Sequence, residues 1–305
     1  MSGPTANWLA DGRRLHLNHG PIDLIVEAFG AEDECRAACR QAVARFDTIL
    51  EELVAELPAL RSPVGEEPRS FASTTARRME AAVERHPPAF VTPMAAVAGS
   101  VADEVLAALV EGRTLARAYV NNGGDSAFYL REGESLEAAI AGTGNGFADR
   151  VTIRSGDPVR GMATSGWRGR SHSLGIADAV TVLARSAASA DVAATLIANA
   201  VDLPGHPAIS RVPACEIDPD SDLRDRLVTQ AVGALSRSEV AQALERGFAV
   251  AEAMRDRGLI ESAALFLCGA VRECGAAPLV TMRDRAAKGA TGPRNISSNR
   301  IAHHA

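Results

Sequence analysis

Lysine is almost absent from this chain of 305 residues. Lys288 is its single lysine, and arginine supplies the rest of the 32 basic residues. No lysine before position 288 is therefore present to act as a base, a nucleophile or a phosphate clamp. Aromatic residues make up only 4% of the sequence, whereas hydrophobic residues as a whole make up 47%. The core must therefore be built from Ala, Val, Leu and Ile.

Other absences exclude whole classes of protein. The net charge of −6 has the wrong sign for a nucleic-acid-binding surface. No run approaches the length of about 18 uninterrupted apolar residues that a membrane-spanning helix needs. The first residues lack the basic start and apolar run of a secretory signal. Five scattered cysteines, an odd number, fit a reducing compartment. Together these features predict a cytoplasmic protein without nucleic-acid or membrane partners.

Helix and strand patterns intermix along the chain without a steady alternation. We expect strands at residues 15–18, 22–28, 118–120, 126–130, 151–154, 159–164, 179–185 and 263–268. We expect helices at residues 32–57, 75–86, 94–109, 189–201 and 236–258. Residues 62–70 should form a loop, and residues 132–145 and 203–222 should form surface connections. This mixture favours an α+β fold over a Rossmann-type parallel sheet.

The clearest local pattern lies between residues 92 and 130. After the predicted helix and a short buried strand, residues 121–125 read Asn-Asn-Gly-Gly-Asp, which is typical of a tight turn before a second strand. The adjacent Gly123 and Gly124 let the backbone bend, and they let a ligand come close because no Cβ is in the way. The same residues also suit an ordinary hairpin turn, so both interpretations stay open.

Asp191 and Thr195 are four residues apart on a predicted helix, and this spacing places both side chains on one side of it. A carboxylate beside a hydroxyl is a pair of hard oxygen donors that suits Mg²⁺ or Ca²⁺. The alternative is that Asp191 caps the N-terminus of its own helix while Thr195 packs.

A loop rich in Gly, Ser and Arg follows the strand predicted at residues 159–164. Its hydroxyls, backbone amides and two guanidiniums, at Arg168 and Arg170, suit a phosphate or a carboxylate. The alternative is a solvated loop with surface arginines. His172 lies in the same loop, although an isolated histidine is more often structural than catalytic. The other histidines lack the spacing of a zinc site.

Three segments, in this order, resemble the ApbE-like superfamily, whose typical members use Mg²⁺ to transfer FMN from FAD to a protein threonine. Residues 96–103 (AVAGSVAD) resemble its helix motif A-K-G-x-x-x-D, and residues 120–125 (VNNGGD) resemble V-N-x-G-G-D. Residues 164–166 (TSG), His172 and residues 190–195 (ADVAAT) resemble T-S-G, a histidine and A-D-x-x-A-T. The resemblance covers roughly residues 92–201. It looks most like an uncharacterised cytoplasmic branch of the superfamily rather than the flavin transferases themselves.

This resemblance implies a fold and a set of site residues. It implies one ApbE-like α+β domain over residues 1–283, with a mixed central sheet and helices packed on the outside. We expect residues 284–305 to be a disordered tail. By resemblance, Asp191, Thr195 and a backbone carbonyl near Ala96 would bind Mg²⁺, and His172 would hold the position of the catalytic histidine. The residues expected to bind FAD or FMN are Asn121, Gly123, Gly124, Asp125, Thr164, Ser165, Gly166 and Arg168.

Two departures from the superfamily bear on activity. Ala98 stands where the helix motif has lysine, and the D-P-x-T-G segment that normally follows the histidine is missing. The leading function is Mg²⁺-dependent binding of a flavin nucleotide or a related dinucleotide, with FMN or phosphoryl transfer as the chemistry if the protein is an enzyme. The alternative is a non-catalytic partner or carrier protein of the same fold in cofactor or sulfur metabolism. The sequence does not determine the substrate, the acceptor or the oligomeric state. A homo-oligomer is one of the open alternatives.

Overall fold

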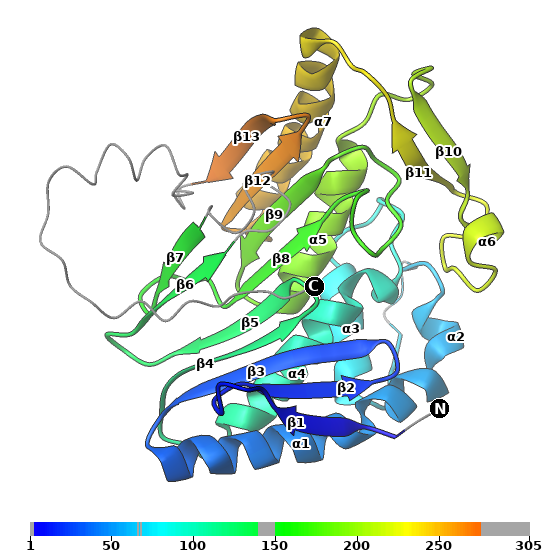
Figure 1. Ribbon diagram of the computed structural model, residues 1–305. Coiled ribbons are helices and arrows are strands. Elements are labelled where there is room, and N and C mark those ends of the chain that lie inside the picture. Colours follow the sequence, from blue (N-terminus) through cyan, green and yellow to red (C-terminus); the bar gives the residue numbers. More distant parts are fainter. Residues whose placement is uncertain (1–2, 66, 68, 140–149, 276–305) are drawn as a thin grey trace, which may run out of the picture.

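A nine-stranded sheet forms the centre of the structure, a computed structural model that describes residues 3–65, 67, 69–139 and 150–275 (Figure 1). Its strands are β1 (Thr5–Trp8), β2 (Leu15–His19), β3 (Ile22–Gly30), β4 (Leu115–Asn122), β5 (Asp125–Leu130), β8 (Gly161–Ser165), β9 (Ala179–Ala184), β12 (Ser262–Leu267) and β13 (Ala270–Gly275). Their order across the sheet is β1-β2-β3-β4-β5-β8-β9-β12-β13. The α+β class predicted from the sequence is confirmed.

The sheet is antiparallel at every described strand pair, so the prediction of a mixed sheet was wrong. Short turns join β1 to β2, β2 to β3, β4 to β5 and β12 to β13, and a short hairpin turn necessarily reverses the direction of the chain. The longer connections also return the chain in the opposite direction, those through helices included. Intermixed helices and strands in the sequence therefore did not imply parallel pairing.

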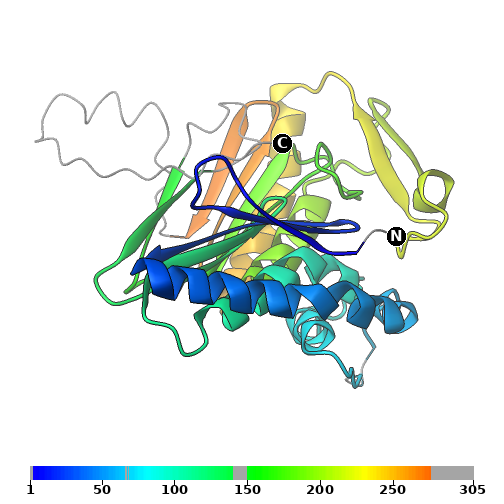
Figure 2. The ribbon, with the colours of Figure 1, turned by 60° about the horizontal axis from the view of Figure 1, so that its bottom comes forward.

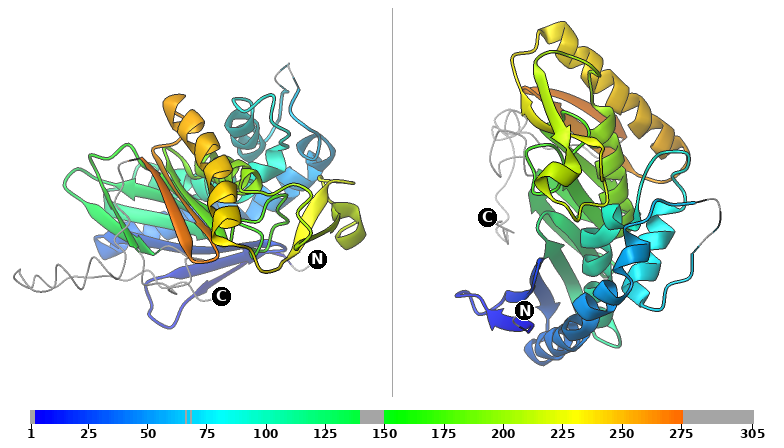
Figure 3. Two further views of the ribbon diagram at one scale, coloured as in Figure 1. Left: turned by 90° about the horizontal axis from the view of Figure 1, so that it is seen from above. Right: turned by 90° about the vertical axis from the view of Figure 1, so that its right-hand side faces the viewer.

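Helices cover one face of this sheet (Figure 3). They are α1 (Glu32–Ala55), α2 (Leu57–Leu60), α3 (Thr74–Val83), the 3₁₀ turn η1 (Pro93–Ala96), α4 (Val97–Val110), α5 (Ala187–Ala200) and α7 (Arg237–Asp256). The five helices predicted from the sequence are present, with ends shifted by a few residues. The segment Pro93–Val110 is long and apolar enough to span a membrane, but 56% of it is buried inside the protein, as in a core helix.

The core between helices and sheet is built from small aliphatic residues. Helices α4 and α5 approach one another closely at Gly99, where a Cβ would lie 2.7 Å from the backbone nitrogen of Ala188. Buried alanines form much of the inward face of α5: Ala187, Ala188, Ala190, Ala193, Ala194 and Ala198. Because these side chains are short, the N-terminal turns of α4 and α5 lie against each other and beside the ends of β5 and β8.

A separate hairpin packs on the other face of the sheet. It consists of β6 (Ser135–Ala139) and β7 (Arg150–Arg154), and its apolar side chains cover Tyr119 and Phe128 of the sheet. Residues 132–145 were predicted to be only a surface connection, which was wrong for β6. Residues 140–145 lie outside the described residues, as does the predicted tail at 284–305.

An arm, residues 209–232, stands away from the central sheet (Figure 2). It contains β10 (Ile209–Pro213), α6 (Ala214–Ile217) and β11 (Leu227–Val232), with β10 and β11 paired as an antiparallel ribbon. The prediction of a plain connection at residues 203–222 was therefore wrong. The arm is anchored where the backbone N–H of Thr229 donates to the carbonyl of Ser173, at 2.9 Å, and where the Thr92 hydroxyl donates to Asp222.

Candidate functional site

The Gly-Gly turn is shorter than the sequence indicated, and the residues around it point to two different faces. Gly123 and Gly124 alone connect β4 to β5, with φ angles of 65° and 138° that favour glycine. Asn122 pairs with Asp125 across the hairpin, so both side chains lie on the face that α4 covers. The amide of Asn122 donates to the carbonyl of Ala98, in the first turn of α4, at 3.1 Å.

Asn121 lies on the opposite face of the hairpin from Asp125. Its amide donates to the hydroxyl of Ser126 at 2.8 Å, and its side chain is 4% exposed. The role of Asn121 in nucleotide binding stays a prediction, but the structure does not bring it together with Asp125.

Each of the helices α4 and α5 has its first amides bonded by a carboxylate from the other helix. Asp191, in the second turn of α5, accepts a hydrogen bond from the backbone N–H of Gly99 at 2.9 Å. Asp103, in the second turn of α4, accepts from the N–H groups of Ala187 and Ala188 at 3.0 and 2.9 Å. We call this arrangement the reciprocal caps. It satisfies amides that a helix start otherwise leaves without partners.

The alternative in which Asp191 caps its own helix was wrong. The N-terminal residue that caps α5 is Ser186, whose hydroxyl accepts from the N–H of Ser189 at 3.1 Å. Asp191 instead joins α5 to α4, so its position depends on the packing of both helices.

Asp125 and Asp191 are neighbouring buried carboxylates, and both have a raised pKa. Burial raises the pKa of Asp125 from its ordinary value to about 7, although it accepts a hydrogen bond from the N–H of Thr164 at 3.2 Å. Burial, followed by the charge of Asp125, raises the pKa of Asp191 well above its ordinary value. Burial therefore favours the neutral forms of both groups, and the positive charge of Arg170 acts against this effect at Asp125.

These donors fit a hard divalent cation. Thr195 lies one turn beyond Asp191 on α5, and Ala96 is the residue that immediately precedes α4. Carboxylate, hydroxyl and carbonyl oxygens are the donors that Mg²⁺ uses, and Mg²⁺ keeps several waters instead of an all-protein shell. Within the part of the chain that the structure describes, no three acidic, histidine or cysteine side chains come together as metal ligands. Hard oxygen donors of this kind suit Mg²⁺.

The loop after β8 brings its two arginines into different surroundings. The Nε of Arg168 donates to Asp178 at 2.6 Å, and its guanidinium lies over the ring of Trp167. The other oxygen of Asp178 accepts from the N–H of Cys268 at 2.6 Å, so this aspartate joins the loop to the turn between β12 and β13. Arg170, in contrast, lies against the Gly-Gly turn, with its Cζ 3.0 Å from the position of a Cβ at Gly123.

Thr164, Ser165 and Gly166 lead from β8 into this loop. The hydroxyl of Thr164 lies 2.9 Å from that of Thr181 on the adjacent strand. A Cβ at Gly166 would lie 2.6 Å from the carbonyl oxygen of Asp178, so the start of the loop is packed tightly against the chain that leads into β9. Thr164 is thus linked to Asp125 through its backbone N–H, whereas no contact places Ser165 in the same group.

His172 is half-buried beside a hydrogen-bonded clamp on α5. The side-chain carbonyl of Asn199 accepts from the Ser173 hydroxyl at 3.2 Å and from the Leu174 N–H at 2.9 Å. Asn199 follows Asp191 and Thr195 at four-residue intervals along α5. The loop that carries His172 is therefore attached to the helix that carries the candidate metal ligands.

The site thus gathers Asp125, Asp191, Gly99 and the Gly-Gly turn around the first turns of α4 and α5. Asn122, Asp103 and Asn199 were not among the predicted site residues, although Asn122 belongs to the predicted turn and Asp103 ends the motif at residues 96–103. A signal for Asn199 was present, because it continues the spacing of Asp191 and Thr195 by one more turn. The contact of Asn122 with Ala98 and that of Asp103 with Ala187 join residues that are distant in the sequence, so no spacing pattern predicts them.

The class of protein defined here is an α+β protein with an acidic site between two helix N-termini and a glycine hairpin. The chain belongs to the family described as AbpE bacteria, whose model matches residues 6–273. This match confirms the resemblance to the ApbE-like superfamily.

Similar proteins include the UPF0280 proteins of Methanopyrus kandleri, Methanococcoides burtonii and Methanococcus vannielii. The first is 35% identical over 182 residues, which cover 58% of this chain and 69% of that protein. The second is 36% identical over 117 residues, covering 38% and 48%, and the third is 41% identical over 115 residues, covering 36% and 45%. In several of these matches, this chain spans only about half the length of the related protein.

Two solved structures have a distant likeness to this chain. They are the flavin transferase ApbE from Vibrio cholerae, at a TM-score of 0.42 and 13% identity, and the flavinyl transferase ApbE from Pseudomonas stutzeri, at 0.41 and 12%. The alignments cover 92% of this chain and 99% of the first structure, and 90% and 95% for the second. Likeness at this level does not transfer an activity or a residue's role.

Proposed function

We propose that this protein binds a flavin nucleotide, FAD or FMN, or a related dinucleotide, together with Mg²⁺ at the site between β5, α4 and α5. The observation that carries the proposal is the pair of buried carboxylates Asp125 and Asp191, whose pKa values are raised first by burial and, at Asp191, also by the charge of Asp125. A divalent cation would supply positive charge that stabilises both ionised groups, and it would attract the oxygens of a diphosphate.

In this proposal Asp191, Thr195 and the carbonyl of Ala96 would hold the metal ion, and Asp125 would add a second carboxylate from the hairpin. The metal ion supplies positive charge that offsets the negative charge of a diphosphate group. Gly123 and Gly124 admit the ligand against bare backbone, and Thr164, Ser165 and Gly166 border it. His172 takes a proton from the hydroxyl of an acceptor if transfer occurs, and the Asn199 clamp holds its loop on α5.

The test is a calorimetric titration of the protein with FAD, with and without Mg²⁺. Asp191→Asn should abolish the Mg²⁺-dependent part of FAD binding, because it removes a charged metal ligand. Asp103→Asn is the matched control, since Asp103 caps a helix in the same way but bonds the amides of Ala187 and Ala188. Unchanged FAD binding by Asp191→Asn would refute the proposed metal site, whereas equal losses in both variants would indicate a loss of helix packing.

Efficient FMN transfer to the threonine target of the usual transferases is not expected. Ala98 provides a methyl group where the related motif has an ammonium, and loss of a contact to phosphate commonly reduces a rate by about two to three decades. The measurement is flavin fluorescence on a denaturing gel after incubation with FAD, Mg²⁺ and a target domain. A strongly fluorescent target band that His172→Ala removes would contradict this expectation.

The second candidate function is a non-catalytic partner or carrier protein of the same fold. The same alanine at position 98 favours it, because this change affects the expected chemistry while leaving the metal ligands in place. Tight FAD and Mg²⁺ binding without any transfer to protein or small hydroxyl acceptors would support this second function.

A further inference from the structure

One arginine beside the site has no fixed partner of its own. Arg170 is exposed, and its guanidinium lies against the backbone of the Gly-Gly turn, with Cζ 3.0 Å from the position of a Cβ at Gly123. Among the residues that the structure describes, no ion pair within 4.0 Å involves Arg170. Asp125 lies two residues beyond Gly123. Burial raises the pKa of Asp125, and the positive charge of Arg170 partly offsets that rise.

The neighbouring Arg168 differs in each of these respects. It donates to Asp178 at 2.6 Å and stacks on Trp167, so its position is fixed by two contacts within the loop. Arg170 is therefore the guanidinium of this loop that is both close to the acidic pair and able to turn toward a ligand.

We propose that Arg170 binds the phosphate oxygens of the nucleotide and that, before metal and nucleotide bind, the same guanidinium acts as a temporary counter-charge to Asp125. This inference rests on the function proposed above, because it concerns the same site. It assigns to Arg170 the phosphate contact that a lysine at position 98 would make, and no lysine precedes Lys288 in this chain.

The chemistry of the side chain suits both roles. A guanidinium carries a permanent positive charge and presents several N–H donors in a plane, which matches phosphate oxygens. It is also repelled by a divalent cation held near Asp125, because like charges at short range in partly buried surroundings interact strongly. Because Gly123 has no side chain, the guanidinium of Arg170 can lie directly against the backbone of the Gly-Gly turn.

This arrangement has a consequence that a purely structural arginine would not have. Arg170 should weaken the binding of a divalent cation alone, since both positive charges favour the same carboxylate. It should strengthen the binding of a phosphate-containing ligand once the cation is present. The effects of removing Arg170 on the two affinities are therefore opposite in sign.

The experiment uses the full chain and two titrations. Free Mn²⁺, measured by electron paramagnetic resonance, reports metal binding without nucleotide, and flavin fluorescence reports FAD binding at saturating Mg²⁺. Arg170→Gln should bind Mn²⁺ alone about threefold more tightly and FAD about tenfold more weakly than the unchanged protein. Arg170→Lys keeps the charge and should leave Mn²⁺ affinity unchanged while it restores only part of the FAD affinity.

Arg185→Gln is the control, because Arg185 is an exposed arginine that pairs with Glu261 at the other end of β9. It should change neither affinity. Arg170→Gln with both affinities unchanged, or with both lowered together, would overturn the inference while the proposed function stands. A loss of FAD affinity in Arg168→Gln but not in Arg170→Gln would also overturn it. A native protein that binds neither Mn²⁺ nor FAD would overturn the proposed function and this inference with it.

Discussion

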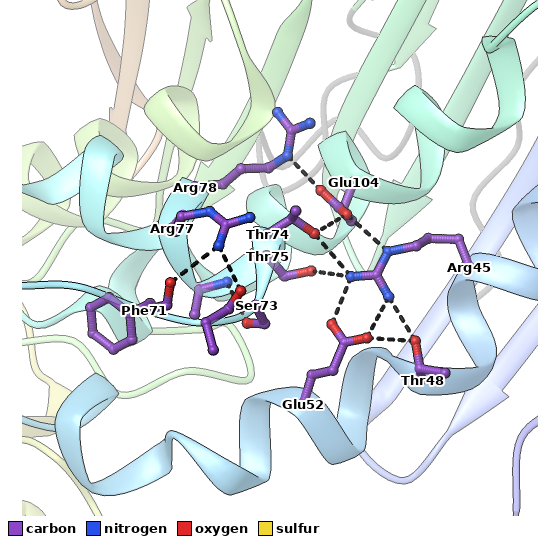
Figure 4. Close-up of polar contacts among 12 residues, drawn as sticks. Arg45, Thr48, Glu52, Phe71, Ser73, Thr74, Thr75, Arg77, Arg78 and Glu104 are labelled. Carbon is purple, nitrogen blue, oxygen red and sulfur yellow. Dashed lines mark hydrogen bonds and ion pairs between the residues drawn. The ribbon is translucent and has the colours of Figure 1, made fainter.

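Glu104 on α4 and Asp191 on α5 are both carboxylates at the centre of the helical layer, but their surroundings differ in positive charge. Arg45 and Arg78 donate to the two oxygens of Glu104 at 2.8 and 2.7 Å, and the Thr74 hydroxyl also donates to it (Figure 4). Burial alone would raise the pKa of Glu104, but these hydrogen bonds hold it below its ordinary value.

The network around Glu104 is closed by the protein's own residues. Arg45 also bonds Glu52 and Thr48 of α1, so that α1, α3 and α4 are joined through one guanidinium (Figure 4). Asp191 has backbone amides and a second carboxylate as neighbours, and burial and that carboxylate raise its pKa. The difference teaches that the charges around Glu104 are paired within the protein and join its helices, whereas the carboxylates at Asp191 and Asp125 lack such pairing, which is why we propose that they bind a cation.

The largest effect on stability is expected from Glu104→Ala. The substitution leaves the guanidinium of Arg45, whose side chain is 19% exposed, without one of its two carboxylate partners. Breaking one side of a largely buried ion pair should lower the free energy of unfolding by about 3 kcal/mol. Chemical denaturation monitored by circular dichroism gives this quantity.

Glu32→Ala is the matched control for that experiment. Glu32 pairs with Arg36 on the surface of α1, where the two side chains are 81% and 63% exposed, so its loss should cost less than about 0.5 kcal/mol. If both substitutions cost the same, the distinction between a closed network and an open site would fail.

A change in pH should affect the acidic pair and the Glu104 network in opposite directions, because the pKa of Asp125 is raised whereas that of Glu104 is lowered. The pKa of Asp125 is raised from 3.8 to about 7, so its contribution to stability is fully present below pH 3.8 and is lost as the pH rises through about 7. In buffer with EDTA, which removes divalent cations, the unchanged protein should therefore become less stable as the pH rises from about 5 to about 8.

Asp125→Asn should reduce that dependence, because the amide carries no charge and still accepts from the N–H of Thr164. At the alkaline end we expect the variant to be more stable than the unchanged protein by about 2 kcal/mol, as measured by thermal unfolding. Addition of Mg²⁺ should stabilise the unchanged protein more than the variant. An equal dependence on pH in both proteins would show that Asp125 is ionised without cost.

Apart from the Glu32 control, the smallest effect on stability is expected from Ser186→Ala. This substitution removes the hydroxyl of the N-cap residue of α5, which should lower the free energy of unfolding by about 1 kcal/mol. Asp103 still bonds the N–H groups of Ala187 and Ala188, so Mg²⁺ binding should be retained. Calorimetric titration of the variant measures this; a loss of Mg²⁺ binding would show that the cap positions the acidic pair directly.

The sequence predicted most of the strands inside the central sheet and missed the two strands at its edges, the β6 strand and the strands of the arm. β4 and β9 were recognised by their apolar residues, whereas β1 is exposed at all four positions and lies at the edge of the sheet. β13 lies at the other edge, and β10 and β11 belong to the arm. Such strands are held by pairing with a neighbour, which leaves little periodic pattern in the residues themselves.

The candidate site was predictable to the extent that it follows local spacing. Asp191 and Thr195 were found because four residues make about one helical turn. The bond from Gly99 to Asp191 joins residues 92 positions apart, and no periodicity reports it. The sequence did not show that Asn121 and Asp125 lie on opposite faces of the hairpin. That result depends on the exact length of the turn, because a shift of one residue in a strand moves every side chain to the other face.

The reciprocal caps have a consequence for the exchange of backbone hydrogens with solvent. Amides in the first turn of a helix usually exchange fast, because no carbonyl of the helix accepts from them. Here the amides of Gly99, Ala187 and Ala188 are bonded to carboxylates of the facing helix, so each can exchange only when α4 and α5 separate. Deuterium uptake at three amides in two distant parts of the sequence would thus follow one opening event. A cation bound at Asp191 would slow that event, and the amide of Gly99 would register ligand binding from inside the core.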